Sequence, residues 1–337
     1  SLVGSEMCIR DRTITVLLFL VGLFLIIKGG DVFVDRAVWI AEVFNIPKFI
    51  IGATIVSIAT TLPEILVSTI ATFSGNNSIA MGNAVGSVTA NTAMIMAISI
   101  IFLSSTIETK NFKFGMICLI SSAFILMMIC KNGTVSALGS LLAFGVVIIF
   151  TWNNLSSSKQ NTVLKTSNGN VILPAIPIIK PTKKQVFINS SLFVLSAAAI
   201  TVGAKLLVES GTDIAKALGV SERVIGLTII AIGTSLPELV TTITAIAKKH
   251  SSLSIGNIIG ANIIDLSLII PICSFISTGK FGVPLTFEPQ YEMLDIPICL
   301  GFILIACLPP LLKKKFYKFQ GVALLVLYFL YIGFSVL

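Results

Sequence analysis

The chain is poor in charge and in metal-binding side chains. Only 11% of its 337 residues are charged, it has one histidine, and its six cysteines show no CxxC spacing. With 55% hydrophobic residues and a mean hydropathy of +1.01, it could not cover its surface with polar groups, which excludes a water-soluble enzyme. The scattered cysteines argue against a disulfide framework and a zinc site. The net charge of +8 does not indicate nucleic-acid binding, because the basic residues lie between apolar segments and form no patch with aromatic residues.

Long apolar stretches separated by short polar connections make up most of the chain. Each has about 17 to 25 residues, the length that a helix needs to cross a bilayer. We predict ten spans, at 14–38, 49–73, 79–103, 114–130, 135–151, 186–209, 224–247, 253–277, 293–310 and 319–336. The chain is therefore expected to be an all-α polytopic membrane protein, and the charged second half of its first span could run along the membrane interface. Residues 1–12 match neither a signal peptide nor the following helix, so we expect a non-native leader there.

Basic residues are unevenly shared between alternate connections. The odd-numbered connections hold fourteen lysines, whereas the even-numbered ones hold only Lys131, Lys216, Arg223 and Lys280. Because cytoplasmic connections are enriched in basic residues, this asymmetry predicts an N-terminus outside and a cytoplasmic loop at 152–185. The lysines are then orientation signals first, with contacts to anionic membrane lipids as a secondary effect.

The chain contains an internal repeat at an offset of 174 residues. Residues 51–91 align with residues 225–265 without a gap, and 14 of the 41 positions are identical. The shared positions include polar and helix-breaking ones: Gly52 with Gly226, Thr60 with Thr234, Pro63 with Pro237, Glu64 with Glu238, Gly82 with Gly256, Asn83 with Asn257, and Gly86 with Gly260. With five spans in each half, the two copies must enter the membrane in opposite directions. We therefore predict two inverted-topology five-helix repeats at 13–151 and 186–337, a linker at 152–185, and a site near the membrane midplane between the copies.

An acidic residue lies in the middle of the second and of the seventh predicted span. Glu64 occurs in SIATTLPEILVS and Glu238 in AIGTSLPELVTT. A charge at the bilayer centre costs about 2.5 to 3.5 kcal/mol on insertion scales, so these carboxylates need a partner or a task. Hydroxyls lie four and three residues before each carboxylate, on the same helical face: Thr60, Thr61, Thr234 and Ser235. A face lined with oxygen atoms indicates a cation site.

Two prolines and a second polar stripe complete this pattern. Pro63 and Pro237 should kink their helices and free backbone carbonyl oxygens beside the carboxylates. The next span of each copy carries a stripe at a spacing of four residues: Asn83, Ser87 and Asn91 in the first copy, and Asn257, Ala261 and Asp265 in the second. Glycines in a small-xxx-small pattern, at 82, 86, 256 and 260, should let these stripes pack closely against the kinked helices. Oxygen ligands of these kinds suit hard cations such as Ca²⁺ or Na⁺, and the only histidine, His250, lies in a polar connection.

Simpler interpretations exist for each of these residues. A single Ser, Thr or Asn in a membrane helix most often makes only an interhelical or back-bonded hydrogen bond. The three mid-membrane acids could be structural carboxylates; duplication with the same neighbours argues against this for Glu64 and Glu238, but Asp265 aligns with the neutral Asn91. Charged residues outside the repeated polar core are expected to snorkel to the interface or to pair locally: Lys28, Asp31, Asp35, Arg36 and Lys205.

The repeated motifs resemble those of the cation/calcium exchanger superfamily, in particular the prokaryotic sodium/calcium antiporters. The resemblance covers nearly the whole chain and is most specific in TTLPE followed by GNAVGS, and in GTSLPE followed by GNIIGAN. It implies secondary active antiport without a bound cofactor, in a bacterial or archaeal plasma membrane, in which a central cluster takes Ca²⁺ or several Na⁺ in alternation and the first and sixth spans slide against the rest. The ligands that it implies are the side chains of Glu64, Glu238, Thr60, Thr234, Thr61, Ser235, Ser87, Asn91 and Asp265, and the backbone carbonyls of Ser57 and Ala231.

Departures from the family's motifs leave the coupling ion open. Ala59 and Val88 replace a glycine and an asparagine, and Ala261 replaces the serine that would match Ser87, which puts one Na⁺ site in doubt. The proton/calcium branch carries NATE where this chain has TTLPE, so Na⁺ is favoured over H⁺ as the driving ion. A K⁺-dependent Na⁺/Ca²⁺ exchanger, a cation channel and an intramembrane aspartyl hydrolase are the other hypotheses. The expected partners are Ca²⁺, Na⁺ and membrane lipids, with no nucleic acid and no obligatory protein partner.

Overall fold

Helices make up almost all of the chain that the structure describes. The computed structural model describes residues 2–44, 46–102, 109–167, 181–217, 233 and 235–336. In chain order the elements are α1 (Leu2–Val43), α2 (Lys48–Ile51), η1 (Gly52–Val56), α3 (Ser57–Thr60), α4 (Leu62–Phe73), α5 (Asn77–Ala90), η2 (Asn91–Met96), α6 (Ala97–Phe102), α7 (Thr109–Ile129), β1 (Thr134–Val135), α8 (Ala137–Ser167), α9 (Lys183–Ala217), α12 (Leu236–Ala247), α13 (Ser251–Ile264), η4 (Asp265–Ile269), α14 (Ile270–Phe281), β2 (Leu285–Thr286), η5 (Tyr291–Asp295), α15 (Ile296–Lys313) and α16 (Lys318–Val336), where η marks π-helix.

Within the described residues, seven helical segments are long and apolar enough to cross a membrane by themselves. The pair Lys48–Thr60 and Leu62–Phe73, bent by 45°, passes the same test as one broken span. Two shorter apolar helices, Leu236–Ala247 and Lys318–Phe334, coincide with the seventh and tenth predicted spans. The described residues thus confirm an all-helical membrane fold, and the count of ten stays a prediction, because part of the seventh predicted span, 224–232 and 234, lies outside them.

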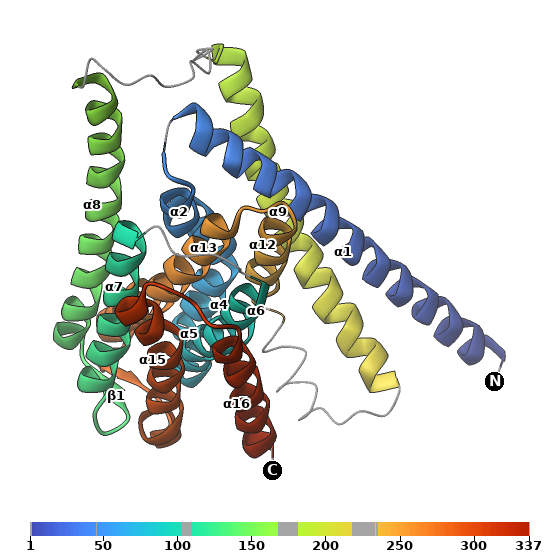
Figure 1. Cartoon of the computed structure of the whole chain (residues 1–337). Coiled ribbons are helices and arrows are strands. Elements are labelled where there is room, and N and C mark those ends of the chain that lie inside the picture. Colours follow the sequence, from blue (N-terminus) through green and yellow to red (C-terminus); the bar gives the residue numbers. More distant parts are fainter. Residues whose placement is uncertain are drawn as a thin grey trace.

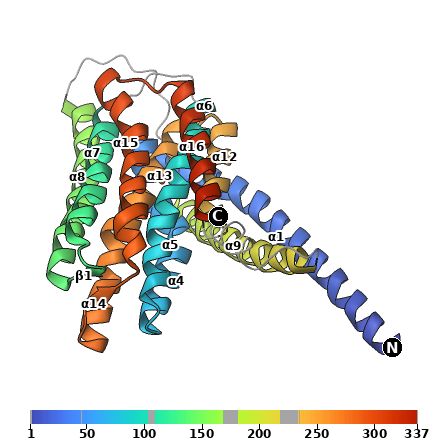
Figure 2. The same cartoon turned by 90° about the horizontal axis from the view of Figure 1, so that it is seen from below.

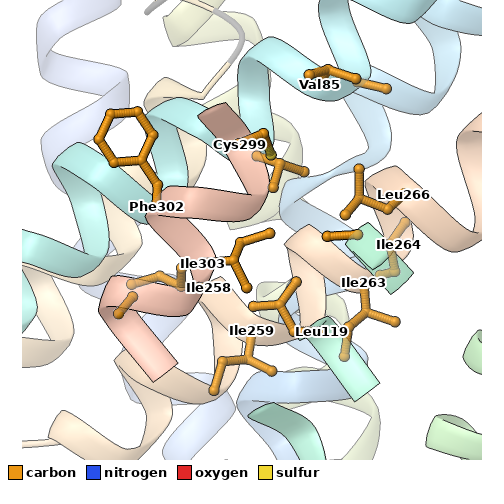
Figure 3. Packing of buried hydrophobic residues seen from close by; sticks show 14 of the residues in the cluster. Val85, Leu119, Ile258, Ile259, Ile263, Ile264, Leu266, Cys299, Phe302 and Ile303 are labelled. Atoms are coloured by element: carbon orange, nitrogen blue, oxygen red, sulfur yellow. The ribbon is translucent and has the colours of Figure 1, made fainter. Parts of the chain in front are cut away.

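The core is formed where helices of the two halves interleave. Leu119 of α7, Ile259 of α13 and Ile303 of α15 are buried and lie together (Figure 3). Since lipid tails are as apolar as leucine, such contacts stabilise the fold through tight packing more than through removal of water. β1 and β2, one from each half, pair antiparallel with Thr134 opposite Thr286, a contact that the sequence analysis did not predict.

α1 and α9 form a separate pair beside this bundle. The two helices cross side by side, and their ends reach away from the other helices (Figures 1 and 2). One face of the second half of α1, with Phe33, Val34 and Ala37, is fully buried against α9 and the bundle. The position of this half relative to the membrane interface stays a prediction. α8 also continues to Ser167, so its helix extends into the segment predicted as a linker.

The predicted close packing of small residues is confirmed in the second copy. A Cβ atom on Gly256 would lie 2.4 Å from the carbonyl oxygen of Phe49, and one on Gly260 would lie 2.6 Å from that of Ala53. Only glycine therefore lets α13 approach α2 and η1 this closely. In the first copy, a Cβ atom on Gly82 would lie 2.5 Å from the hydroxyl oxygen of Tyr291, and one on Gly86 would meet no described atom within 4 Å.

Candidate functional site

A break in the second span positions the first carboxylate. α3 ends at Thr60, Thr61 has φ −85° and ψ 0°, and α4 begins at Leu62 with Pro63 in its first turn. The predicted kink at Pro63 is confirmed by the 45° bend between the two segments. Glu64 follows the break directly, so its carboxyl group lies where the helix changes direction. Pro237 has the same place in the first turn of α12, after Ser235 at φ −89° and ψ 8°.

The backbone oxygen of Glu64 accepts a hydrogen bond, whereas its carboxylate receives none from the described residues. Asn83 donates its side-chain amide to the backbone oxygen of Glu64, at 3.2 Å, and to the hydroxyl of Ser68, at 2.9 Å. The side chain of Glu64 is buried, and neither Oε1 nor Oε2 has a hydrogen-bond partner among the described residues. A buried carboxylate without a donor is unfavourable unless it is protonated or binds a cation.

Glu238 joins the two halves of the chain. Thr61, from the first half, donates its hydroxyl to Oε1 of Glu238 at 3.2 Å. Oε2 of Glu238 is buried and has no partner within the described part of the chain. The hydroxyl-bearing residue before one carboxylate therefore contacts the carboxylate of the other copy, as expected of a site between two inverted repeats.

The third carboxylate begins a π-helical segment. Asp265 starts η4, and its repeat mate Asn91 starts η2. Both side chains are buried, and Oδ1 of each and Oδ2 of Asp265 have no partner in the described residues. π-helical turns occur often at functional sites, where they change the direction of a side chain.

These groups converge on one buried region. Glu238 and Asp265 lie close enough to Glu64 to repel its carboxylate electrostatically, and Glu238 acts on Asp265 in the same way. Side-chain oxygens of Ser87 and Ser235 are also buried and lack a partner within the described ranges. A dehydrated cation bound in this region could offset the charge of the three carboxylates and accept lone pairs from the serine hydroxyl oxygens as well.

The acids do not form a metal cage by themselves. Within the described residues, no group of three or more His, Cys, Asp or Glu side chains is arranged to hold a metal ion. Any cation bound here must also take neutral oxygens from hydroxyl, amide or carbonyl groups, which is common for Ca²⁺ and Na⁺ and uncommon for zinc.

The remaining predicted ligands are partly described. The hydroxyl of Thr60 donates to the carbonyl of Ser57, at 3.3 Å, and to Oδ1 of Asn257, at 3.2 Å. The backbone amide of Thr61 also donates to that carbonyl, at 2.9 Å, so the predicted carbonyl ligand of Ser57 is engaged in this structure. Thr234 and Ala231 lie outside the described residues, so their predicted roles stay predictions.

Two further hydroxyl groups near the site, on α12, were not predicted from the sequence. Thr241 and Thr242 are fully buried on α12, and their hydroxyl oxygens lack a partner in the described chain. They lie three and four residues after Glu238, so they extend its polar face by one helical turn. That spacing was visible in LPELVTT, but the matching first-repeat positions, Val67 and Ser68, carry only one hydroxyl.

The sequence is similar to known proteins along nearly its whole length. Residues 14–155 and 189–337 match the family described as sodium/calcium exchanger protein. The chain is 30% identical over 318 residues to the uncharacterized membrane protein MJ0091 of Methanocaldococcus jannaschii, covering 94% of this chain and 96% of that protein. It is 28% identical over 348 residues to the sodium/calcium exchanger MaX1 of Methanosarcina acetivorans, covering 94% of this chain and 97% of MaX1.

A solved structure shares the fold. The sodium-calcium exchanger NCX_Mj, soaked with 2.5 mM Na⁺ and 10 mM Sr²⁺, superimposes with a TM-score of 0.78 at 28% sequence identity, covering 96% of this chain and 99% of that chain. The sequence motifs, the helical membrane fold and these similarities agree, and the chain belongs to the sodium/calcium exchanger protein family.

Proposed function

We propose that this chain is a secondary active antiporter that exchanges Na⁺ for Ca²⁺ by alternating access. The observation that carries the proposal is the buried set of three carboxylates, Glu64, Glu238 and Asp265, whose oxygens are largely without partners in the described part of the chain. The exchanger names of MaX1 and NCX_Mj support Na⁺ and Ca²⁺ as the cargo. The proposed ligands are the eleven residues predicted from the motifs, with Ca²⁺ and Na⁺ as cargo and no bound cofactor.

The charge of the site explains why transport would be coupled. One Ca²⁺, or several Na⁺, can offset the charge of the three carboxylates, whereas an empty site would carry unpaired charge through a region of low dielectric constant. The protein would therefore change between its inward-open and outward-open states with a cation bound, and would stay in one state when the site is empty. This requirement makes inward movement of one cation depend on outward movement of the other.

The proposed location is the plasma membrane of a prokaryote. The excess of lysine in the odd-numbered connections supports an N-terminus outside and a cytoplasmic segment at 152–185. Cysteine labelling from each side of intact cells at exposed positions, such as Glu288 and Lys249, tests this orientation, since the two lie in connections predicted to face opposite sides.

Ion replacement in proteoliposomes tests the function. Vesicles loaded with Na⁺, with K⁺ or with an acidic buffer are diluted into medium containing radiolabelled Ca²⁺. We expect uptake from Na⁺-loaded vesicles only, and its loss in Glu238→Gln but not in Glu288→Gln, an exposed acid outside the site. Uptake driven by the pH gradient alone would assign the protein to proton/calcium exchange, and a requirement for K⁺ together with Na⁺ would assign it to K⁺-dependent exchange.

A further inference from the structure

α1 and α9 contact each other as one unit. The rings of Phe33 and Phe193 stack with their centroids 4.5 Å apart, and Arg36 of α1 hydrogen-bonds to Asn189 of α9. A Cβ atom on Gly22 would lie 2.8 Å from the carbonyl oxygen of Gly203, so the backbones approach closely. The N-terminal part of α1 and the C-terminal part of α9 extend away from the bundle in both views (Figures 1 and 2), so the pair packs on its neighbours along only part of its length.

The second half of α1 packs on α12, the helix of Glu238. A Cβ atom on Gly30 would lie 2.7 Å from Cγ1 of Val240 and 3.1 Å from Oγ1 of Thr244. Glu238 is in the first turn of α12, and Lys248 follows the last residue of this helix. Since ten residues of helix span about 15 Å, Lys248 lies roughly half a membrane thickness from the carboxylate.

Lys248 connects the end of α12 to α1 through three contacts. Its ammonium nitrogen lies 2.8 Å from Oδ1 of Asp35, 3.0 Å from Oδ1 of Asp31, and 2.8 Å from the backbone oxygen of Asp31. The side chain of Lys248 is only 25% exposed, while those of the two aspartates are about half exposed. Burial alone would lower the pKa of Lys248, but hydrogen bonds and charges from Asp35 and Asp31 outweigh it and raise the pKa, so Lys248 is charged at neutral pH.

From these contacts we infer that Lys248 is a positioning residue of the exchanger, which together with Asp31 and Asp35 forms a latch that closes the face of the protein carrying the α12–α13 connection. The inference rests on the proposed function, because it assigns the latch to one of the two alternating states. By the predicted orientation this face is cytoplasmic. When α1 moves along α12, the three contacts separate and the face opens; when they form again, the site is reachable only from the other side.

The first test compares the two faces of the protein. Lys248→Gln removes the latch and should populate the state that is open to this face. The Ca²⁺ concentration for half-maximal exchange should then fall by about three- to tenfold on this face. On the opposite face, the same concentration should be unchanged or higher. Lys248→Arg should behave as wild type, and so should Lys249→Gln, the exposed neighbour. The charge-reversed pair Lys248→Asp with Asp35→Lys should restore the wild-type values. Equal weakening on both faces, or no change on either, would show a structural role only and overturn the latch.

The second test needs no transport. In a Cys8→Ser background, the pair Asp35→Cys and Lys248→Cys should form a disulfide whose rate of formation differs between Na⁺, Ca²⁺ and cation-free buffer. A rate that is the same in all three buffers would mean that the two segments do not separate, and would overturn the latch. Absence of exchange by the wild type would instead overturn the proposed function, and the cross-linking rates would still decide about the latch.

Discussion

At the scale of single residues, the site brings three acidic side chains into one buried region. Glu64 has two buried carboxylate oxygens without a partner in the described chain, and the charges of Glu238 and Asp265 reach it. The cation-free protein therefore contains repulsion that its fold must tolerate. Function and stability are expected to respond in opposite directions when one of these charges is removed.

Replacing Glu64 by Gln tests this balance. The cation-free variant should melt at a higher temperature than the cation-free wild type, because a buried amide neither repels Glu238 and Asp265 nor has to take up a proton when the chain folds. Ca²⁺ at a hundredfold excess over its Kd should stabilise the wild type by about 2.7 kcal/mol and the variant by much less, since its affinity is lost. Thermal unfolding in detergent, with Ca²⁺ and with a chelator, measures both effects. A variant that is stabilised by Ca²⁺ as strongly as the wild type would remove Glu64 from the site.

Ala261 is the position where the second repeat lacks a hydroxyl that the first repeat has. It is fully buried, and its mate is Ser87. Ala261→Ser should supply one further oxygen for a Na⁺ ion and lower the Na⁺ concentration for half-maximal Ca²⁺ exchange by about two- to fivefold. Ala261→Cys is the matched control, because sulfur is of similar size but is a poor ligand for Na⁺. Equal effects of the two variants would indicate a change of packing and no new ligand.

The pKa of His250 leads to a prediction of how the stability of the protein depends on pH. Burial and the nearby charge of Lys48, whose ammonium nitrogen lies 3.3 Å from Nδ1, lower the pKa of His250 from its ordinary 6.5; Lys248 acts in the same direction, and Glu42 and Asp35 oppose it. The unfolded chain then binds a proton at a higher pH than the folded protein does, so unfolding becomes more favourable as the pH falls below 6.5. His250→Gln should flatten this part of the pH profile of the melting temperature. A profile identical to that of the wild type would exclude His250 as its cause.

At the scale of helices, the site depends on how closely α13 approaches the broken second span. Gly256 and Gly260 face backbone oxygens of α2 and η1 at distances that no Cβ atom can occupy. The same contact brings Asn257 to Thr60, whose hydroxyl lies 3.2 Å from Oδ1 of Asn257. Packing and site geometry are therefore set by the same residues.

Gly256→Ala should separate these helices. We expect a loss of about 1 to 3 kcal/mol in the free energy of unfolding, because the new methyl group must displace backbone. Gly301→Ala in α15, where a Cβ atom would meet nothing within 4 Å, should instead be neutral or stabilising by up to about 1 kcal/mol. Chemical unfolding of both variants in detergent measures the difference, and a Gly256→Ala variant as stable as Gly301→Ala would contradict the packing argument.

At the scale of the whole molecule, local patterns predicted more than long-range contacts did. The apolar runs and the 174-residue repeat predicted the helical membrane fold, and Pro63 predicted the break in the second span. Each of these features is a pattern in the sequence itself. The π-helical turns at Asn91 and Asp265 could not be predicted, since they depend on tertiary packing. The pairing of Lys248 with Asp35, 213 residues apart, has no local signal, and neither does the contact between β1 and β2.

The measurement that tests the account most directly is whether Ca²⁺ enters only when a cation can leave. Radiolabelled Ca²⁺ uptake is followed into proteoliposomes loaded with Na⁺, with unlabelled Ca²⁺, or with choline. The account predicts uptake in the first two cases and none with choline, because the protein with its three carboxylates empty cannot change face. Uptake at the same rate into choline-loaded vesicles would contradict antiport and indicate a channel or a uniporter.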